Sequence, residues 1–321
     1  MKQMLLFMTP FYGYSNEIIK QLENEGWDVS FYSDEIEWTF FKRVLMKINK
    51  KSVEKQFDKY FEKCISEQKG KKFDEILIIF GLMFFTKRHF ERLKEEFPGA
   101  KLVYYVWDSE CKFPVIKQLL SASDIAYTFD DVDAKNNNAN FLPLYYVKKQ
   151  KATDNYKYDA STVLTFFADK YESLKLITSV LKDRKLYLYL RFSTFTNFIK
   201  LLICSPYVFK GIGRKHFHFQ ALNKQQLQDV FDDSFAIIDC PLTHQHGLTM
   251  RTFEALSRSK KLITTNKNIK NYPFYTEDNI FVSEDENIKI PDNFFTTPFN
   301  EDFQLDEKYS LENFVKTLTD I

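Results

Sequence analysis

The sequence predicts an α/β protein built from two Rossmann-like domains, each a doubly wound parallel sheet covered by helices on both faces. The length of 321 residues is about twice the usual size of a domain. Short apolar runs alternate with segments of helical period along most of the chain. A polar, tyrosine-rich stretch, "ANFLPLYYVKKQKATDNYKYDAS", interrupts this series. We therefore expect an N-terminal domain over 1–150 and a C-terminal domain over 151–321.

The N-terminal half has the alternation that favours a buried parallel sheet. Its apolar runs are bounded by Gly, Pro or Asp, as strands covered on both faces usually are. The strands are expected at 3–9, 28–32, 74–80, 101–107 and 124–129, and the helices at 15–26, 37–68, 86–96 and 113–122. A last short strand precedes the tyrosine-rich stretch.

The C-terminal half repeats the pattern. Strands are expected at 161–167, 185–190, 235–240, 261–265 and 279–283, and helices at 170–184, 194–204, 223–231 and 247–258. The final "SLENFVKTLTDI" predicts a closing helix, capped by Ser310, that packs back on the N-terminal domain. In such a pair of sheets we expect the carboxyl ends of the strands to face a central cleft, the usual place for a ligand.

Composition excludes several classes of protein. The 45 basic and 44 acidic side chains nearly cancel, so no nucleic-acid partner is expected. The four cysteines are scattered, without a C-x-x-C pair, which favours free thiols in a reducing compartment. The apolar run at the N-terminus is too short for a signal peptide, and no later stretch is long enough to span a bilayer. We expect a cytoplasmic protein.

Residues 247–282, "GLTMRTFEALSRSKKLITTNKNIKNYPFYTEDNIFV", follow "AIIDCPLTHQH" and carry a resemblance. This segment resembles the donor site of bacterial GT-B glycosyltransferases that build capsular polysaccharide and lipopolysaccharide. "YYVWDS" and "DIAYTFDDVDAKNNNANFLPLYY" resemble the inter-domain end of the same family. The match covers about 40 residues tightly and most of the chain loosely. Rossmann-like halves without a G-x-G-x-x-G motif also favour something other than a dehydrogenase.

The resemblance implies a site for a nucleotide diphosphate sugar. Glu254 matches the glutamate that accepts hydrogen bonds from the ribose hydroxyls, and Gly247 matches the turn where the backbone approaches the diphosphate. A helix N-terminus offers amides to phosphate, here those of Gly247, Leu248 and Thr249. Arg251, one turn before Glu254, projects from the same side of the helix, toward the diphosphate. The alternative is a solvated surface ion pair.

One departure from the family pattern concerns stereochemistry. Many retaining members carry a second glutamate eight residues before the first, and here that position is His246. The anomeric outcome is therefore open. His246 and Gln245 become candidate neutral donors to the sugar or the phosphate, although a histidine in a polar loop is often merely solvated.

Two cations follow predicted strands of the C-terminal domain. Lys170 and Arg191 are expected to neutralise the departing diphosphate. Without a D-x-D motif on a strand-end loop we expect a metal-independent reaction, with no cofactor beyond the donor substrate. Asp130, Asp131 and Asp133 in "FDDVDA" are expected to cap a helix or turn, and not to bind a metal.

The N-terminal domain is expected to bind the acceptor, an oligosaccharide or lipid-linked sugar. In "TPFYGYSN", Gly13 allows close approach, Tyr14 and Asn16 offer hydroxyl contacts, and Ser15 is a candidate helix N-cap. Asp108, in "VWDSE" after a predicted strand, is the best carboxylate for the base of an inverting reaction. A role as N-cap of the next helix competes.

Residues 38–51, "WTFFKRVLMKINKK", place apolar and basic side chains on largely separate faces of a helix. This pattern fits peripheral contact with an anionic membrane, and it fits equally a helix packed on the core. The aromatic and basic stretch 195–219 is a second candidate for such contact, and its apolar residues fit equally well packed inside the protein. The function expected is transfer of a sugar to a growing cell-surface polysaccharide. The rivals are a polyol-phosphate transferase, a nucleotide-sugar epimerase and a non-catalytic scaffold subunit.

Overall fold

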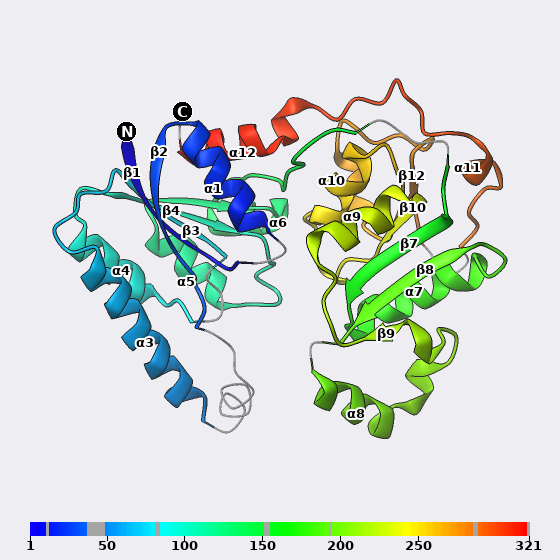
Figure 1. Cartoon of the computed structure of the whole chain (residues 1–321), viewed down its shortest axis with the longest axis horizontal. Coiled ribbons are helices and arrows are strands. Elements are labelled where there is room, and N and C mark those ends of the chain that lie inside the picture. Colours follow the sequence, from blue (N-terminus) through cyan, green and yellow to red (C-terminus); the bar gives the residue numbers. More distant parts are fainter. Residues whose placement is uncertain are drawn as a thin grey trace. The chain divides into compact units, whose positions relative to one another are not determined.

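The computed structural model describes residues 1–10, 13–36, 49–80, 84–150, 155–192, 194–284 and 288–319. The chain divides into two compact units, Met1–Pro143 with Leu311–Ile321, and Leu144–Ser310. Each unit holds a six-stranded parallel sheet with flanking helices (Figure 1). The α/β class with two doubly wound parallel sheets is confirmed.

The first unit has the strand order β2-β1-β3-β4-β5-β6. Its strands are β1 (Lys2–Met8), β2 (Trp27–Tyr32), β3 (Glu75–Ile79), β4 (Lys101–Val106), β5 (Ile125–Thr128) and β6 (Asn140–Phe141). Its helices are α1 (Tyr14–Asn24), α3 (Lys50–Glu67), α4 (Lys87–Glu96), α5 (Val115–Ala122), α6 (Asp131–Asn137) and α12 (Leu311–Thr319). The side chains of β3 are buried throughout, as expected for a central parallel strand with helices on both faces.

Aromatic side chains fill the core between this sheet and α3 and α4. The rings of Phe57 and Phe61 lie 6.3 Å apart, and Phe85 meets each edge-on at 5.3 and 5.7 Å. Phe7 of β1 meets the edge of Phe85 at 5.5 Å. Since each ring is almost fully buried, replacing one by alanine is expected to cost about 3–5 kcal/mol. This cluster positions the carboxyl ends of β1 and β3.

The C-terminal helix α12 belongs to the first unit. The ring of Phe314 meets the edge of Tyr105 at 4.8 Å, and the hydroxyl of Tyr127 donates to the carbonyl of Thr317 at 3.0 Å. The chain therefore returns to its first sheet after completing the second.

The second unit has the strand order β12-β11-β10-β7-β8-β9. Its strands are β7 (Tyr158–Thr165), β8 (Leu186–Arg191), β9 (Phe217–His218), β10 (Ser234–Asp239), β11 (Lys261–Thr264) and β12 (Ile280–Val282). Its α-helices are α7 (Ala168–Val180), α8 (Phe195–Cys204), α9 (Lys224–Asp232), α10 (Met250–Ser257) and α11 (Asn293–Thr296). Ala236, Ile238 and Ile263 pack on the face covered by α7. Helices α9 and α10 lie on the other face (Figure 1).

Several local predictions are confirmed and others are corrected. Asp130 caps α6 by accepting from the amides of Val132 and Asp133, and all four cysteines are free thiols. Ser15 is not a helix cap. Gly13, with a φ of 82°, occupies the N-cap position of α1, and Ser15 is buried inside the helix. The helix expected from residue 247 begins at Met250.

Residues 37–48, which include most of the predicted amphipathic stretch, lie outside the described residues. Within the described ranges, no helix combines the length and the apolar character that crossing a membrane requires.

Candidate functional site

The strand order of the second sheet creates a switch point between β7 and β10. The chain leaves β7 toward β8 on one side and leaves β10 toward β11 on the other, so the loops after these two strands diverge. The backbone ladder between them ends at Ser161 and Ile237, and the hydroxyl of Thr162 then donates to the carbonyl of Ile238 at 2.8 Å. Ligands of open α/β sheets bind at this kind of edge.

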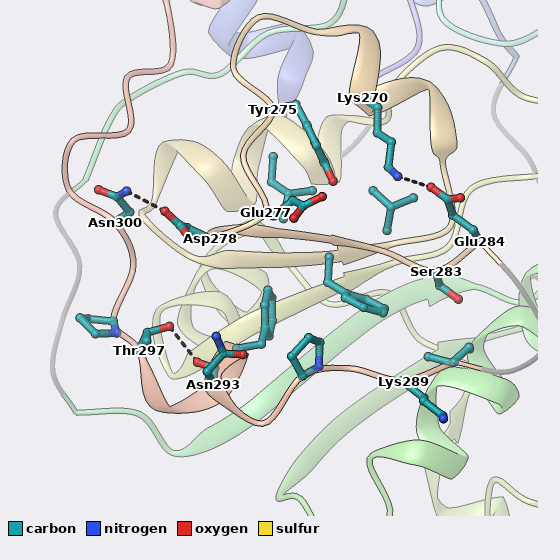
Figure 2. Close-up of a pocket in the computed structure, with 17 residues that line it drawn as sticks. Lys270, Tyr275, Glu277, Asp278, Ser283, Glu284, Lys289, Asn293, Thr297 and Asn300 are labelled. Carbon is teal, nitrogen blue, oxygen red and sulfur yellow. Dashed lines mark hydrogen bonds and ion pairs between the residues drawn. The ribbon is translucent and has the colours of Figure 1, made fainter.

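A cavity of about 730 Å³ flanks the outer strand β12. Within its lining Lys270 pairs with Glu284, and Asn300 donates to Asp278 at 3.0 Å (Figure 2). No residue expected at the donor site lines this cavity. It therefore has no part in the site that the sequence predicts.

A second cavity, of about 400 Å³, lies at the carboxyl edge of the second sheet. Loops after β10, β11 and β12 line it together with α7, and among the lining residues are Gln245 and His246. Asn266 donates from Nδ2 to the carbonyls of His246 and Gly247, each at 3.2 Å, and Asn268 donates to the His246 carbonyl at 3.1 Å. The loop backbone is thereby fixed, and the His246 side chain is exposed.

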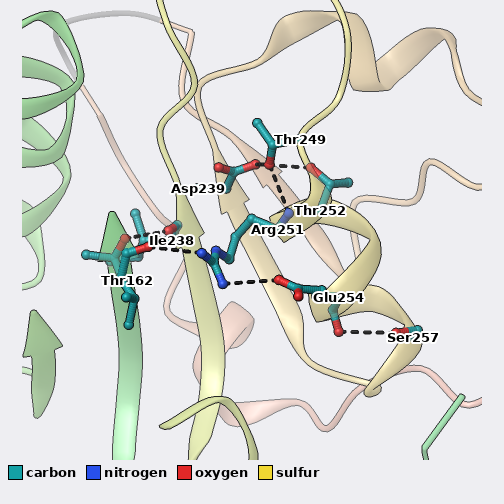
Figure 3. A network of polar contacts seen from close by, with 9 residues as sticks. Thr162, Ile238, Asp239, Thr249, Arg251, Thr252, Glu254 and Ser257 are labelled. Atoms are coloured by element: carbon teal, nitrogen blue, oxygen red, sulfur yellow. Dashed lines mark hydrogen bonds and ion pairs between the residues drawn. The ribbon is translucent and has the colours of Figure 1, made fainter. Parts of the chain in front are cut away.

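The start of α10 is built on a buried carboxylate at the end of β10. Thr249 is the N-cap, and its Oγ1 accepts from the amide of Arg251 at 3.1 Å. The Oδ2 of Asp239 accepts from the hydroxyls of Thr249 at 2.6 Å and Thr252 at 3.1 Å (Figure 3). Asp239 thus stands where the helix dipole favours negative charge. Gly247 and Leu248, just before the cap, are buried.

Arg251 joins three elements. Its Nη1 donates to Glu254 Oε2 at 3.1 Å, and its Nη2 donates to the carbonyl of Val163 on β7 at 3.1 Å (Figure 3). The guanidinium carbon lies 4.6 Å from the centre of the Phe231 ring on α9. The side chains of Arg251 and Glu254 are each 20% exposed. The pair lies on one side of the helix, as expected, and it is not the solvated surface pair offered as the alternative.

The two candidate cations lie at the same edge of the sheet. Lys170 is in the first turn of α7, with its Nζ 5.8 Å from the ring of Phe167. Arg191 ends β8, in register with Thr165 of β7. Within the part of the chain that the structure describes, the buried Nε of Arg191 has no hydrogen-bond partner. A buried donor in this state favours binding of an anion.

The acceptor candidates lie at the carboxyl edge of the first sheet. Gly13 precedes α1, Tyr14 is buried in its first turn, and Asn16 is exposed. Asp108 follows β4 and forms an ion pair with Lys112 at 3.1 Å. The competing role for Asp108, as N-cap of the next helix, is wrong, because Pro114 occupies the N-cap of α5.

No group of three or more His, Cys, Asp and Glu side chains suited to a metal ion occurs among the described residues.

The sequence prediction missed Asp239, Thr252, Asn266 and Asn268. Asp239 lies near the end of the predicted strand 235–240, and Asn266 directly follows the predicted strand 261–265. Because parallel strands end at one edge of their sheet, a polar residue at the end of each predicted strand is a signal that could have found Asp239 and Asn266.

No protein-family model matches the chain, and no curated protein matches it in sequence. Solved structures are similar over the whole length. They include Anabaena Alr3699/HepE in complex with UDP-glucose, with 9% identity, a TM-score of 0.63, and coverage of 100% of this chain and 99% of that one. AviGT4, a glycosyltransferase involved in avilamycin A biosynthesis, has 10% identity, a TM-score of 0.56, and coverage of 99% and 93%. The lipopolysaccharide outer core galactosyltransferase WaaB has 10% identity, a TM-score of 0.55, and coverage of 99% of each chain. The fold of the chain is that of these GT-B structures.

Proposed function

We propose that the chain is a glycosyltransferase that moves a sugar from a nucleotide diphosphate sugar to a hydroxyl of a growing, lipid-linked cell-surface polysaccharide. The observation that carries the proposal is the placement of Glu254. It projects from α10 beside the switch point of the second sheet and is held by an arginine that also binds β7. A similar fold holds UDP-glucose in one solved structure, and another is a lipopolysaccharide galactosyltransferase.

Glu254 would accept hydrogen bonds from the two ribose hydroxyls of the donor. An ionised carboxylate has about four acceptor sites, so it can bind a diol while keeping its bond to Arg251. Since the contacts of Arg251 with Val163, Phe231 and Glu254 use its guanidinium, we assign it chiefly to positioning Glu254. Its charge would also favour the nearby diphosphate.

Lys170 and Arg191 would bind the diphosphate, with the amides of Gly247, Leu248 and Thr249 beside them. Positive charge stabilises the nucleotide as it leaves, so the reaction would need no metal. In the 400 Å³ cavity, Gln245 and His246 would contact the sugar or a phosphate.

Asp108 would act as the base of an inverting transfer, with Gly13, Tyr14 and Asn16 contacting the acceptor. The bond between the anomeric carbon and the diphosphate breaks, and the acceptor oxygen bonds to that carbon. The acceptor proton passes to the carboxylate, and the nucleoside diphosphate departs with the bonding electron pair. The ion pair with Lys112 would orient the Asp108 carboxylate before the transfer.

The first experiment is a thermal-shift screen of the purified chain against UDP, GDP, CDP, CMP and dTDP. A ligand at a hundred times its dissociation constant stabilises a folded protein by about 2.7 kcal/mol. We expect a shift with one nucleotide that is lost in Glu254→Ala and kept in Glu312→Ala, a matched control in an exposed ion pair on α12.

Product analysis then separates the rivals. An epimerase consumes nucleotide sugar without an acceptor, and a polyol-phosphate transferase releases a nucleoside monophosphate. A scaffold subunit binds donor without transfer to any acceptor. Unchanged turnover and nucleotide affinity in a folded Glu254→Ala protein would overturn the donor site.

A further inference from the structure

One stretch of the second unit carries basic side chains without acidic ones. Residues 191–228 contain no Asp or Glu, although the whole chain has 44 of them. The stretch contains six cations: Arg191, Lys200, Lys210, Arg214, Lys215 and Lys224. Burial lowers the pKa of His216 and of His218, so the positive charge near neutral pH comes from Lys and Arg. The near-neutral chain is thus locally strongly positive.

The same stretch exposes large apolar side chains. Helix α8 is mostly apolar, yet none of its residues is buried. Phe195 is 61% exposed, Ile203 is 74% exposed, and Tyr207 in the following 3-10 turn η1 (Pro206–Phe209) is 72% exposed. Several large apolar side chains exposed within one short segment are uncommon on soluble domains, where apolar patches mark surfaces that bind something.

Helix α8 has two apolar sides, and one of them packs on the core of the second unit. Phe198 packs on Phe192, Phe209 and Phe219 at ring distances of 5.2 to 5.4 Å, and Leu201 packs beside it on the core of the second unit. Phe195, Ile199, Leu202 and Ile203 follow the i, i+4, i+7, i+8 spacing and form a second stripe. The core thus anchors the helix through one side and leaves the other accessible.

Exposed cations occur in the same segment as this second stripe. Lys200 lies on α8, Lys210 follows η1, and Arg214 and Lys215 lie in the 3-10 turn η2 (Arg214–His216); all four are exposed. We call the side chains of Phe195, Ile203 and Tyr207 together with these four cations the α8 surface. Exposed apolar side chains combined with Lys and Arg in one segment match the chemistry of the boundary between anionic headgroups and acyl chains.

We propose that the α8 surface binds an anionic lipid bilayer. Phe195, Ile203 and Tyr207 enter the headgroup boundary, and the four cations contact lipid phosphates. A second copy of the chain is a poorer occupant, because a two-fold contact through this patch sets the same cations against one another. The contact goes beyond the proposed transfer reaction, since it needs no nucleotide.

The test is flotation of the full chain with vesicles of phosphatidylcholine alone or of phosphatidylcholine with phosphatidylglycerol. We expect binding to the anionic vesicles that weakens as salt is raised. Phe195→Gln with Ile203→Gln should lower the partition coefficient by about tenfold or more. Lys210→Gln with Lys215→Gln should lower it by about fivefold for each charge removed.

The matched control is Phe141→Gln with Val147→Gln, which removes an exposed phenylalanine and an exposed aliphatic side chain elsewhere. This variant should bind as the wild type does. Absence of binding to anionic vesicles, or equal binding by the Phe195/Ile203 variant, would overturn the proposal. The proposal would also be overturned if the wild type did not bind vesicles but sedimented as a dimer that the Phe195/Ile203 variant abolishes. The nucleotide thermal shift should persist in every α8 variant, so failure here is separable from failure of the donor site.

Discussion

Arg251 and Glu254 form an ion pair at 3.1 Å in which both side chains are four-fifths buried, while the second Nη of the arginine donates to the carbonyl of Val163. The pair is therefore attached to the sheet and not only to its own helix. A carboxylate held in this way has little rotamer freedom left to lose when it binds a ligand.

Replacing Arg251 should affect nucleotide binding through Glu254. In Arg251→Met the carbonyl of Val163 and the carboxylate both lose a charged donor, so we expect about 1–3 kcal/mol lower stability. We also expect nucleotide affinity to weaken by about tenfold or more. Arg251→Lys should not restore both bonds, since an ammonium lacks the guanidinium fork. Urea unfolding and nucleotide titration measure the two effects.

Arg184→Met is the matched control for that change. It also removes an arginine stacked on a phenylalanine of the second unit, with the guanidinium carbon 4.5 Å from the Phe295 ring centre. Nucleotide affinity should stay at the wild-type level in this variant. Equal affinity in Arg251→Met and Arg184→Met would contradict the positioning role.

Of the two residues Asp239 and Thr249, which are bonded to each other at the start of α10, Asp239 should be the one whose removal lowers the stability of the protein more. Asp239→Ala leaves the hydroxyls of Thr249 and Thr252 without their shared acceptor in a buried place, so we expect about 2–3 kcal/mol of destabilisation. Thr249→Ala removes only the helix cap and its bond, with an expected loss of about 1 kcal/mol. Denaturant midpoints at constant m-value measure both. A smaller loss for Asp239→Ala than for Thr249→Ala would show that the carboxylate does not organise α10.

Arg191 should select for a diphosphate over a monophosphate. Its buried Nε lacks a protein partner among the described residues, so a phosphate oxygen would complete its hydrogen bonding. Arg191→Gln should reduce the ratio of diphosphate to monophosphate affinity by about tenfold. Lys185→Gln, an exposed cation just before the other end of β8, should leave the ratio unchanged. Isothermal titration of both variants decides the point.

The protein should become less stable as the pH falls through the range in which His89 titrates. The His89 Nε2 donates to Asp58 Oδ1 at 3.0 Å, while Nδ1 accepts from the amide of Thr86 at 3.0 Å, which requires the neutral ring. Burial lowers the pKa of His89 below its ordinary value of 6.5. The unfolded chain therefore takes up the proton first, and stability present above pH 6.5 is lost as pH falls toward the folded pKa.

The slope due to one such group is at most about 1.4 kcal/mol per pH unit. His89→Gln keeps an acceptor at the third helical position and removes the titration. Its free energy of unfolding should vary less than that of the wild type between neutral and mildly acidic pH. Parallel curves for the two proteins would assign the pH dependence to other groups.

The sequence by itself determined the two parallel sheets and most of their elements. Buried parallel strands must be apolar along their whole length, and the helices that cover them must be amphipathic, so both types leave a local pattern. The same locality explains why Glu254 and Arg251 could be placed on one side of a helix, and why Asp130 could be identified as a cap.

Tertiary structure decided what those patterns do not contain. The bond from Arg251 to Val163 joins residues 88 positions apart, and it depends on where β7 and β10 separate. The start of α10 at Met250 depends on Asp239 holding Thr249. Which apolar side of α8 is buried depends on the ring of Phe198 meeting three other rings. Spacing along the chain carries no record of such contacts, because each is fixed by the packing of separate elements.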